Sequence, residues 1–201
     1  MPEFDPLRID LPEQLVSERV VLRPWRESDA YGLWEAVDSS RASLGEWMPW
    51  VGEYRTPEDA APVIRRMRSW WLLRQDLVLG IFDKDSGQVL GGSGLHRIDW
   101  RIRRFEVGYW LRDSAVGRGY VTEAVRVLTR FAFEQLEANR VEIRMDPQNT
   151  RSRAIPVRLA YVYEGCLRQS IPDVHGAPRD ADVFALTRHD YHTLQSQRIE
   201  D

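Results

Sequence analysis

The stretch Ser114-Ala-Val-Gly-Arg-Gly-Tyr-Val-Thr-Glu-Ala124 places two glycines around an arginine, between a strand-like run and an amphipathic helix. A turn from a strand into a helix presents several unpaired backbone N–H groups, and the helix dipole adds positive partial charge there. Glycine permits positive φ and the close approach of a ligand. The stretch therefore fits either an anion site for a phosphate or pyrophosphate, or a tight turn that binds nothing.

The helix predicted after these glycines, over residues 120–136, is the best supported element because its apolar residues form one stripe: Val121, Ala124, Val125, Leu128, Phe131 and Ala132. Further helices are predicted over 27–39, over 58–74 with Ala61, Ile64, Met67 and Trp71 at helical spacing, and over a short segment opened by Asn149 and bent or interrupted at Pro156. Strands are predicted over 20–24, 77–82, 89–98, 104–111, 141–145, 161–171 and 181–186. This order predicts one mixed α/β unit, with a loop or short helical turn over 44–51.

Length and composition bound the function. The chain has 201 residues, enough for one domain, which we place over 15–192 between an N-terminal extension over 1–14 and a C-terminal tail over 193–201. A net charge of −3 argues against a general nucleic-acid binder. No apolar run has the length of a membrane helix, and the acidic, proline-interrupted start does not resemble a secretion signal, so we expect a cytoplasmic protein that uses no membrane.

The single cysteine, Cys166, excludes an intramolecular disulfide and a cysteine-rich zinc site, and we expect it to be a small core residue rather than a nucleophile. No pair of histidines has metal-ligand spacing with a supporting carboxylate, so we predict no metal. The basic cluster Trp100-Arg-Ile-Arg-Arg104 lies between two predicted strands, where a solvated hairpin turn is favoured over a ligand contact.

Common phosphate loops do not match the opening stretch. A Walker motif is missing, and Thr122 occupies the place of the third glycine in a dinucleotide-binding pattern. The motifs that remain are Arg19-Val-Val-Leu-Arg-Pro24, Trp47-Met-Pro-Trp50, Gly92-Ser-Gly-Leu-His96, Glu106-Val-Gly-Tyr-Trp-Leu111, Gly117-Arg-Gly-Tyr-Val-Thr-Glu-Ala124 and Asn149-Thr-Arg-Ser152. In this order and spacing, the chain resembles the GNAT acetyltransferases, in the branch of the ribosomal-protein N-terminal acetyltransferases RimJ and RimL.

The resemblance covers about residues 15–191. It implies a twisted, mostly antiparallel sheet, splayed open between the fourth and fifth predicted strands, with acetyl-CoA wedged into the gap as co-substrate. The residues implied to bind the cofactor are Tyr109, Trp110, Leu111, Val116, Gly117, Arg118, Gly119, Tyr120, Val121, Thr122, Asn149 and Ser152.

Three departures from the family pattern bear on this site. Ser114 stands where the family usually has glutamine or arginine, so a contact to the pyrophosphate is missing. Ala160-Tyr161 replaces the usual Gly-Phe, and Pro156 lies inside the predicted helix. The place of the cofactor's thiol end is therefore left open.

Acetyl transfer to an amine needs a proton acceptor, a stabilised oxyanion and a proton for the leaving thiolate. Strand alternation puts Glu106, Gly108 and Trp110 on one face. A covered Glu106 should have a raised pKa, which suits the general base that the resemblance implies; a structural salt bridge is the alternative. Gly108 fits either a bulge that turns an N–H toward the thioester or ordinary strand packing.

By the same resemblance, Ser152 is the general acid, although Asn149 and Ser152 also fit a simple helix cap. Trp47 and Trp50 are implied to wall the acceptor site, with core packing as the alternative. His96, which we place in the acceptor site, and His175 fit either proton shuttles or structural histidines.

The sequence thus predicts an acetyl-CoA-dependent N-acetyltransferase that acts by direct transfer on a primary amine. The resemblance implies that this amine is the α-amine at a protein N-terminus. Two alternatives stay open: an enzyme for a small amine such as an antibiotic, an amino acid or a polyamine, and a non-catalytic acyl-CoA sensor of the same fold. The predicted partners are acetyl-CoA and the amine acceptor, with a homodimer as a possible assembly and no nucleic acid or membrane.

Overall fold

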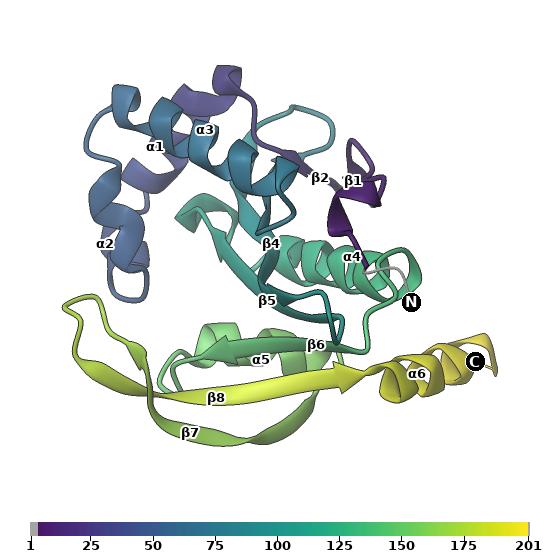
Figure 1. Ribbon diagram of the computed structural model, residues 1–201. Coiled ribbons are helices and arrows are strands. Elements are labelled where there is room, and N and C mark those ends of the chain that lie inside the picture. The colour runs from purple at the N-terminus through teal and green to yellow at the C-terminus, as the bar shows by residue number, and fades with distance from the viewer. Residues whose placement is uncertain (1–3, 201) are drawn as a thin grey trace.

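The protein, seen here as a computed structural model that describes residues 4–200, builds an eight-stranded sheet with helices on both faces (Figure 1). The strands are β1 (Leu15–Val16), β2 (Val20–Pro24), β3 (Leu77–Asp83), β4 (Val89–Asp99), β5 (Arg104–Leu111), β6 (Arg140–Met145), β7 (Val162–Pro172) and β8 (Pro178–Thr187). The α-helices are α1 (Ala30–Asp38), α2 (Arg41–Gly45), α3 (Pro57–Leu72), α4 (Tyr120–Glu134), α5 (Thr150–Arg158) and α6 (Arg188–Glu200). Short 3₁₀ turns are η1 (Pro6–Arg8), η2 (Glu27–Asp29), η3 (Pro49–Glu53) and η4 (Asp113–Ala115).

The sheet has the strand order β1-β2-β3-β4-β5-β6-β8-β7, and it opens in the middle. Each neighbouring pair is antiparallel except β5 and β6, which are parallel. These two pair only where Arg104–Glu106 faces Arg140–Glu142, although β5 continues to Leu111 and β6 to Met145. The predicted fold is confirmed, including the splay between the fourth and fifth predicted strands, which are β5 and β6 once the short β1 is counted.

Two apolar clusters hold the two faces of the sheet. The larger one joins α4, α5 and the strands, with Leu128 and Phe105 among its fully buried members. The second joins α1, η3 and α3 to the opposite face, around Trp25, Leu33 and Ile64. Figure 1 shows α1 and α3 together on one side of the sheet, away from α4.

The buried stripe of α3 differs from the one predicted. Ala60, Val63 and Ile64 are buried, whereas Ala61, Met67 and Trp71 are only half-buried. Of the predicted stripe, Ile64 is buried, and the buried face is turned toward Ala60 and Val63. The prediction failed here because this helix carries more apolar residues than its buried face takes.

Three further expectations about local structure are corrected. The chain beyond β8 continues as α6, a helix that the sequence did not predict because its hydrophobic residues do not form a stripe. Pro156 neither interrupts nor ends α5, which runs from Thr150 to Arg158. Cys166 is exposed on β7, the edge strand, and is not a core residue.

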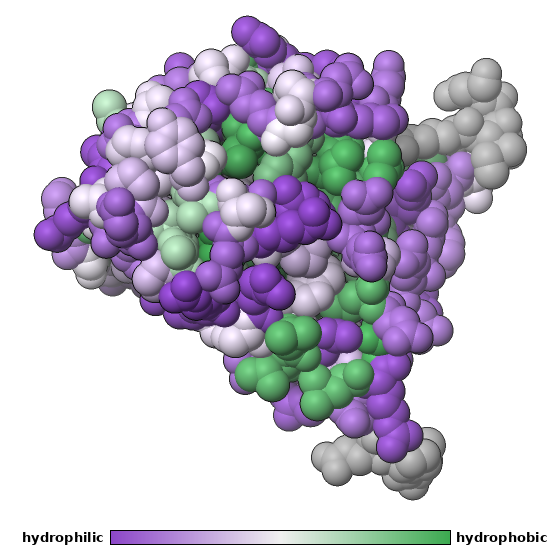
Figure 2. Space-filling model, turned by 90° about the horizontal axis from the view of Figure 1, so that it is seen from above, coloured by the Kyte–Doolittle hydropathy of each residue, from purple (hydrophilic) through white to green (hydrophobic). Residues whose placement is uncertain are grey.

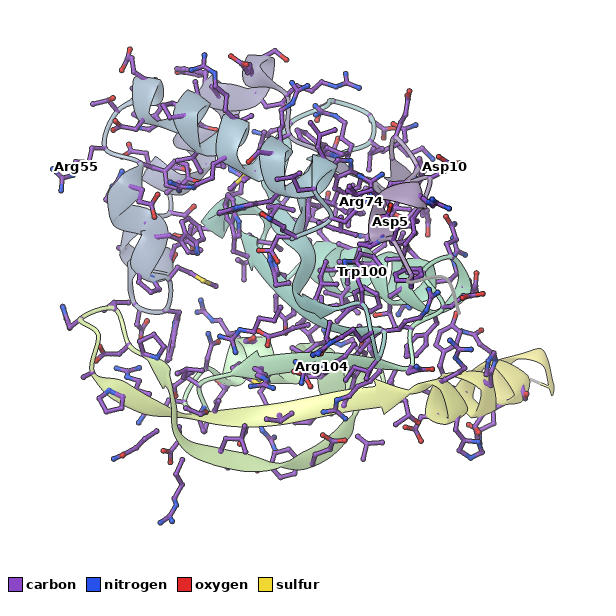
Figure 3. All side chains as sticks on the ribbon, viewed as in Figure 1. Asp5, Asp10, Arg55, Arg74, Trp100 and Arg104 are labelled. Carbon is purple, nitrogen blue, oxygen red and sulfur yellow. The ribbon has the colours of Figure 1, made fainter. Side chains whose placement is uncertain are left out.

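The basic cluster at 100–104 forms the connection between β4 and β5, as the hairpin interpretation predicted. The indole of Trp100 packs edge-on against the ring of Phe105 at 5.2 Å, and its Nε1 donates to the carbonyl of Arg74 at 2.8 Å. Trp100 and Arg74 lie side by side in Figure 3, so the aromatic of this cluster anchors the turn.

The surface is mostly polar, with apolar side chains gathered in separate patches on the face shown in Figure 2. In the described part of the chain, no helix is both long enough and apolar enough to cross a bilayer.

Candidate active site

The glycine stretch forms the turn from β5 into α4, by way of η4. Gly117 and Gly119 have φ values of 81° and 82°, in the left-handed region where a side chain is strained, and Gly119 caps the helix. Within residues 4–200, no protein acceptor takes the backbone N–H groups of Gly117 through Thr122. The turn therefore presents a run of free donors at the positive end of a 15-residue helix.

A carboxylate in the first turn of α4 fixes this loop to the start of β2. Glu123 accepts hydrogen bonds from the Ser17 hydroxyl at 2.7 Å, the Arg19 backbone N–H at 2.7 Å and the Arg19 Nε at 2.8 Å. Arg19 also donates to the carbonyl of Arg118 at 3.0 Å. Burial alone would raise the pKa of Glu123, but these donors hold it below its ordinary value. Two distant motifs, at Arg19 and at Gly117–Ala124, thus meet in one clamp.

A cavity of about 930 Å³, called here the loop cavity, lies beside this turn. Its lining includes ten of the twelve residues predicted to bind the cofactor: Tyr109, Trp110, Leu111, Val116, Gly117, Gly119, Val121, Thr122, Asn149 and Ser152. Arg118 and Tyr120 do not line it. Arg118 is exposed and is held by its carbonyl, and the Tyr120 ring lies under the Arg19 guanidinium, 5.0 Å from the ring centre.

Four arginines line the loop cavity that the sequence did not place there: Arg19, Arg126, Arg151 and Arg158. Arg19 is paired with Glu123, and Arg158 donates to the Thr122 hydroxyl at 3.0 Å. Ser114, the residue that lacks the family's charged group, is exposed and lies outside the cavity lining. The available signal for Arg126, Arg151 and Arg158 was their position on α4 and α5, since both helices begin at the predicted site.

A second cavity of about 480 Å³, called here the tryptophan cavity, lies on the other side of the splayed strands. It is lined by aromatic side chains from the 47–54 segment, the end of α3 and β5, among them Trp47, Trp50, Trp70 and Trp110. Residues 171–174, at the end of β7 and the start of the turn to β8, also line it. Both cavities share seven lining residues, which we call the junction: Glu46, Trp47, Met48, Tyr109, Trp110, Asn149 and Ser152.

Trp47 and Trp50 both line the tryptophan cavity, and the packing that the sequence offered as the alternative is present for Trp50. Trp50 lines the tryptophan cavity and also packs against Trp110 and Tyr54, with ring centres 5.5 and 5.7 Å apart. Trp47 lines both cavities and is half-buried. The wall of the cavity is therefore built from the edge of the second apolar cluster.

The junction holds a pair of hydroxyls. Asn149 caps α5 by accepting from the Ser152 N–H at 3.0 Å, as the cap interpretation predicted. The Ser152 hydroxyl donates to the Tyr109 hydroxyl at 3.1 Å, and Tyr109 donates to the Ser152 carbonyl at 3.0 Å. That carbonyl is free because its helical partner four residues later is Pro156, which has no N–H. Burial raises the pKa of Tyr109 well above its ordinary value, so its hydroxyl keeps its proton.

Glu106 lies on β5 opposite His96 of β4, with its side chain 15% exposed. Its Oε2 is 3.6 Å from Arg97 and 3.4 Å from Arg144, and it accepts no hydrogen bond within the described chain. Burial raises the pKa of Glu106, and the two guanidinium groups offset only part of that effect. Glu106 therefore has both the raised pKa expected of a general base and the nearby arginines expected of a structural salt bridge. Its carboxylate lies behind the cavity walls and lines neither cavity.

His96 does line the tryptophan cavity, and it explains the glycine at 108. Its Nδ1 lies 3.3 Å from the Asp76 carboxylate, and its ring occupies the space above Gly94 and Gly108. A Cβ at Gly108 would come within 2.9 Å of that ring. The register of β4 and β5 is regular at Gly108, so the bulge suggested by the sequence is wrong; the irregularity lies between His96 and Asp99.

Two expectations concern groups outside these cavities. His175 lies exposed in the β7–β8 turn, and it is not among the lining residues of either cavity. Among residues 4–200, no cluster of three or more histidine, cysteine, aspartate or glutamate side chains is arranged to hold a metal ion.

Comparison with known proteins agrees with this geometry. A family model described as an acetyltransferase (GNAT) domain matches residues 19–162. The chain is 30% identical over 178 residues to the putative ribosomal N-acetyltransferase YdaF of Bacillus subtilis, covering 88% of this chain and 95% of that protein.

Solved structures show the same fold. A putative ribosomal-protein-serine acetyltransferase from Vibrio cholerae superposes with a TM-score of 0.75 at 26% identity, over 87% of this chain and 97% of that one. Mycobacterium smegmatis RimJ, in complex with CoA-disulfide, superposes with a TM-score of 0.78 at 25% identity, over 85% of this chain and 83% of that one. The chain is an acetyl-CoA-dependent N-acetyltransferase of the GNAT family, in its RimJ/RimL-like group.

Proposed function

We propose that this enzyme transfers the acetyl group of acetyl-CoA directly to the α-amine at the N-terminus of a protein. The observation that carries the proposal is the meeting of two cavities at one junction, from opposite sides of the splayed β5 and β6. A thioester entering from the loop cavity and an amine entering from the tryptophan cavity come together there without a covalent enzyme intermediate. Relatives named for ribosomal-protein serine and alanine acetylation favour a protein acceptor.

The loop cavity is proposed to hold acetyl-CoA. The free N–H groups of Gly117 through Thr122 are suited to the pyrophosphate, because they converge at the positive end of α4. The arginines of the cavity wall supply positive charge for the remaining phosphate, a role that Ser114 does not fill. Tyr109 through Leu111 continue along the open edge of β5 toward the junction.

In the proposed reaction, the amine nitrogen attacks the thioester carbon, a C–N bond forms, and the C–S bond breaks. Glu106 takes the proton from the amine by way of one water, because its carboxylate lies behind the cavity wall and burial raises its pKa, which makes it a stronger base. Ser152, whose hydroxyl is joined to that of Tyr109, supplies the proton to the departing thiolate and takes one back from water, while Glu106 returns its proton to water. Trp47, Trp50 and His96 contact the acceptor.

The test measures CoA release and the product together. Purified enzyme is given acetyl-CoA with N-terminal peptides in one series and with aminoglycosides, free amino acids and polyamines in another. Acetylation located on a peptide α-amine by mass spectrometry supports the proposal. Turnover of small amines alone shows a small-amine enzyme, and CoA binding with no turnover shows a sensor.

A further inference from the structure

The tryptophan cavity extends beyond the junction into the second apolar cluster. We call its inner half the part lined by Trp25, Leu33, Val63 and Met67, which come from the residue after β2, from α1 and from α3. All four belong to that cluster or pack against it. This part of the lining is apolar, and the charged residues Glu53 and Arg66 of the same cavity pair with each other and are half-exposed.

One hydrogen-bond donor interrupts these apolar walls. Tyr54 lines the cavity, and its hydroxyl has no hydrogen-bond partner among residues 4–200. Burial raises the pKa of Tyr54 well above the ordinary value, so the hydroxyl keeps its proton. A donor without a protein partner on an apolar wall is suited to an oxygen supplied by a ligand.

The reacting end of the cavity is the part at the junction. His96 and the junction residues Tyr109 and Ser152 lie there, with the His96 ring over Gly94 and Gly108. Asp76 beside His96, together with Glu46 at the rim, supplies negative charge for a cationic amine. An acceptor with its amine at the junction therefore directs the group next to that amine into the apolar half.

We propose that the acceptor carries a large apolar or aromatic group next to its amine, with an oxygen at its outer end, and that this group fills the inner half of the tryptophan cavity. The proposal rests on the proposed function and deepens it. An alanine- or serine-sized side chain leaves most of the cavity of about 480 Å³ unfilled. The matching chemistry is an N-terminal tyrosine, phenylalanine or leucine, or a free arylalkylamine.

The first experiment compares peptides that differ only in their first residue. Tyrosine, phenylalanine and leucine peptides are expected to exceed alanine and serine peptides in kcat/KM by about 10²-fold, because each buried methylene in a fitted pocket contributes a factor of ten or more. Tyrosine is expected to exceed phenylalanine by about 10-fold through its hydrogen bond with the Tyr54 hydroxyl. Equal or better use of alanine and serine peptides would overturn the proposal. The same assay with a phenolic arylalkylamine, which has no peptide chain, shows whether the acceptor is a peptide N-terminus or a free amine.

Variants locate the preference in the cavity. Met67→Trp fills the inner half, so the ratio of leucine-peptide to alanine-peptide kcat/KM should fall toward one. Leu72→Trp adds the same indole to the same helix at a 65% exposed position, and the ratio should stay at its wild-type value. Tyr54→Phe, which removes only the hydroxyl, should abolish the preference for tyrosine over phenylalanine. An unchanged ratio in Met67→Trp would contradict the proposed location.

Binding separates this inference from the proposed function. Affinity for the same peptides is measured by calorimetry in the presence of CoA, which requires no turnover. Preferential binding of bulky peptides without acetylation would support the apolar group in the tryptophan cavity and refute the proposed N-terminal acetylation. Acetylation of all peptides with no preference in binding or rate would support N-terminal acetylation and refute the apolar group.

Discussion

The clamp between Glu123 and Arg19 makes the strongest prediction about the loop. In Glu123→Gln, the oxygen that faces Ser17 and the Arg19 backbone can remain, but an NH₂ group then faces the guanidinium, and the ion pair of 2.7 Å is lost. A charge-assisted hydrogen bond contributes about 1.5–3 kcal/mol. Because the Arg19 side chain is 45% exposed, solvent screening reduces the expected loss to about 1–2 kcal/mol.

For a domain of this size, that loss corresponds to a fall in Tm of about 2–8 °C, measured by calorimetry. The same variant should weaken CoA binding by about 10-fold, because the loop that presents the N–H groups loses its attachment to β2. The pKa of Glu123 is lowered in the folded state, so its contribution is present above the ordinary glutamate pKa of 4.5 and is lost as the pH falls through the folded value. The stability gap between wild type and variant should therefore narrow in acid.

Glu58→Gln is the matched control, since it makes the same change in the first turn of α3 at an exposed glutamate. Its Tm and its CoA affinity should remain close to those of the wild type. If Glu123→Gln behaved like this control in both measurements, the clamp would have no part in shaping the loop.

Three of the remaining predictions test the site, and the fourth tests the helix beside it. Gly119→Val should abolish the thermal stabilisation by CoA while the apo protein still folds, because a β-branched residue is strained at a φ of 82° and crowds the free N–H groups. Glu106→Gln should lower kcat by about 10²-fold with no loss of Tm near neutral pH. Because an amide does not ionise, the variant should also lack the decline in stability that the wild type shows as pH rises from the ordinary glutamate pKa through the raised folded value; a loss of Tm in parallel with kcat would indicate a structural ion pair instead. Trp50→Ala should raise the acceptor KM and cost about 3 kcal/mol of stability, whereas a loss of stability alone would remove it from the acceptor site. Pro156→Ala should raise stability by about 1–2 kcal/mol and lower kcat, because the restored N–H competes with Tyr109 for the Ser152 carbonyl; unchanged kinetics would show that this carbonyl does not position the hydroxyl pair.

The fold was predictable from the sequence because its signals are local. The apolar stripe of α4, the alternation of β5 and the glycines at 117 and 119 each follow from the conformation of a few neighbouring residues. The helix α6 escaped prediction because Tyr191 is its one fully buried large side chain among the residues whose burial is described, so the segment shows no helical period.

The part of the candidate site that consists of backbone N–H groups in the glycine turn was predictable from the sequence. The contacts between side chains from different elements were less predictable. The pairing of Ser152 with Tyr109 depends on the distance between α5 and β5, which neither segment encodes alone. The position of Arg126 in the loop cavity has the same origin. Gly108 appeared to mark a bulge because the sequence does not show the His96 ring above it.

One departure from the family pattern has a local cost that the structure makes visible. Ala160, which replaces the usual glycine after α5, takes a φ of 59°. That conformation costs a non-glycine residue about 1 kcal/mol. The replacement leaves the course of the chain intact, because the Ala160 and Tyr161 N–H groups still bond back to the carbonyls of Val157 and Pro156.

The central claim is that the thioester and the amine meet at the junction between the two cavities. The most direct measurement is a crystal structure of the enzyme with a bisubstrate analogue, in which CoA is joined through an acetyl linker to the α-amine of a short peptide. The account predicts the pyrophosphate on the N–H groups of Gly117 through Thr122, and the linker between Ser152 and His96. A linker that lies elsewhere, or a peptide that leaves the tryptophan cavity empty, would contradict it.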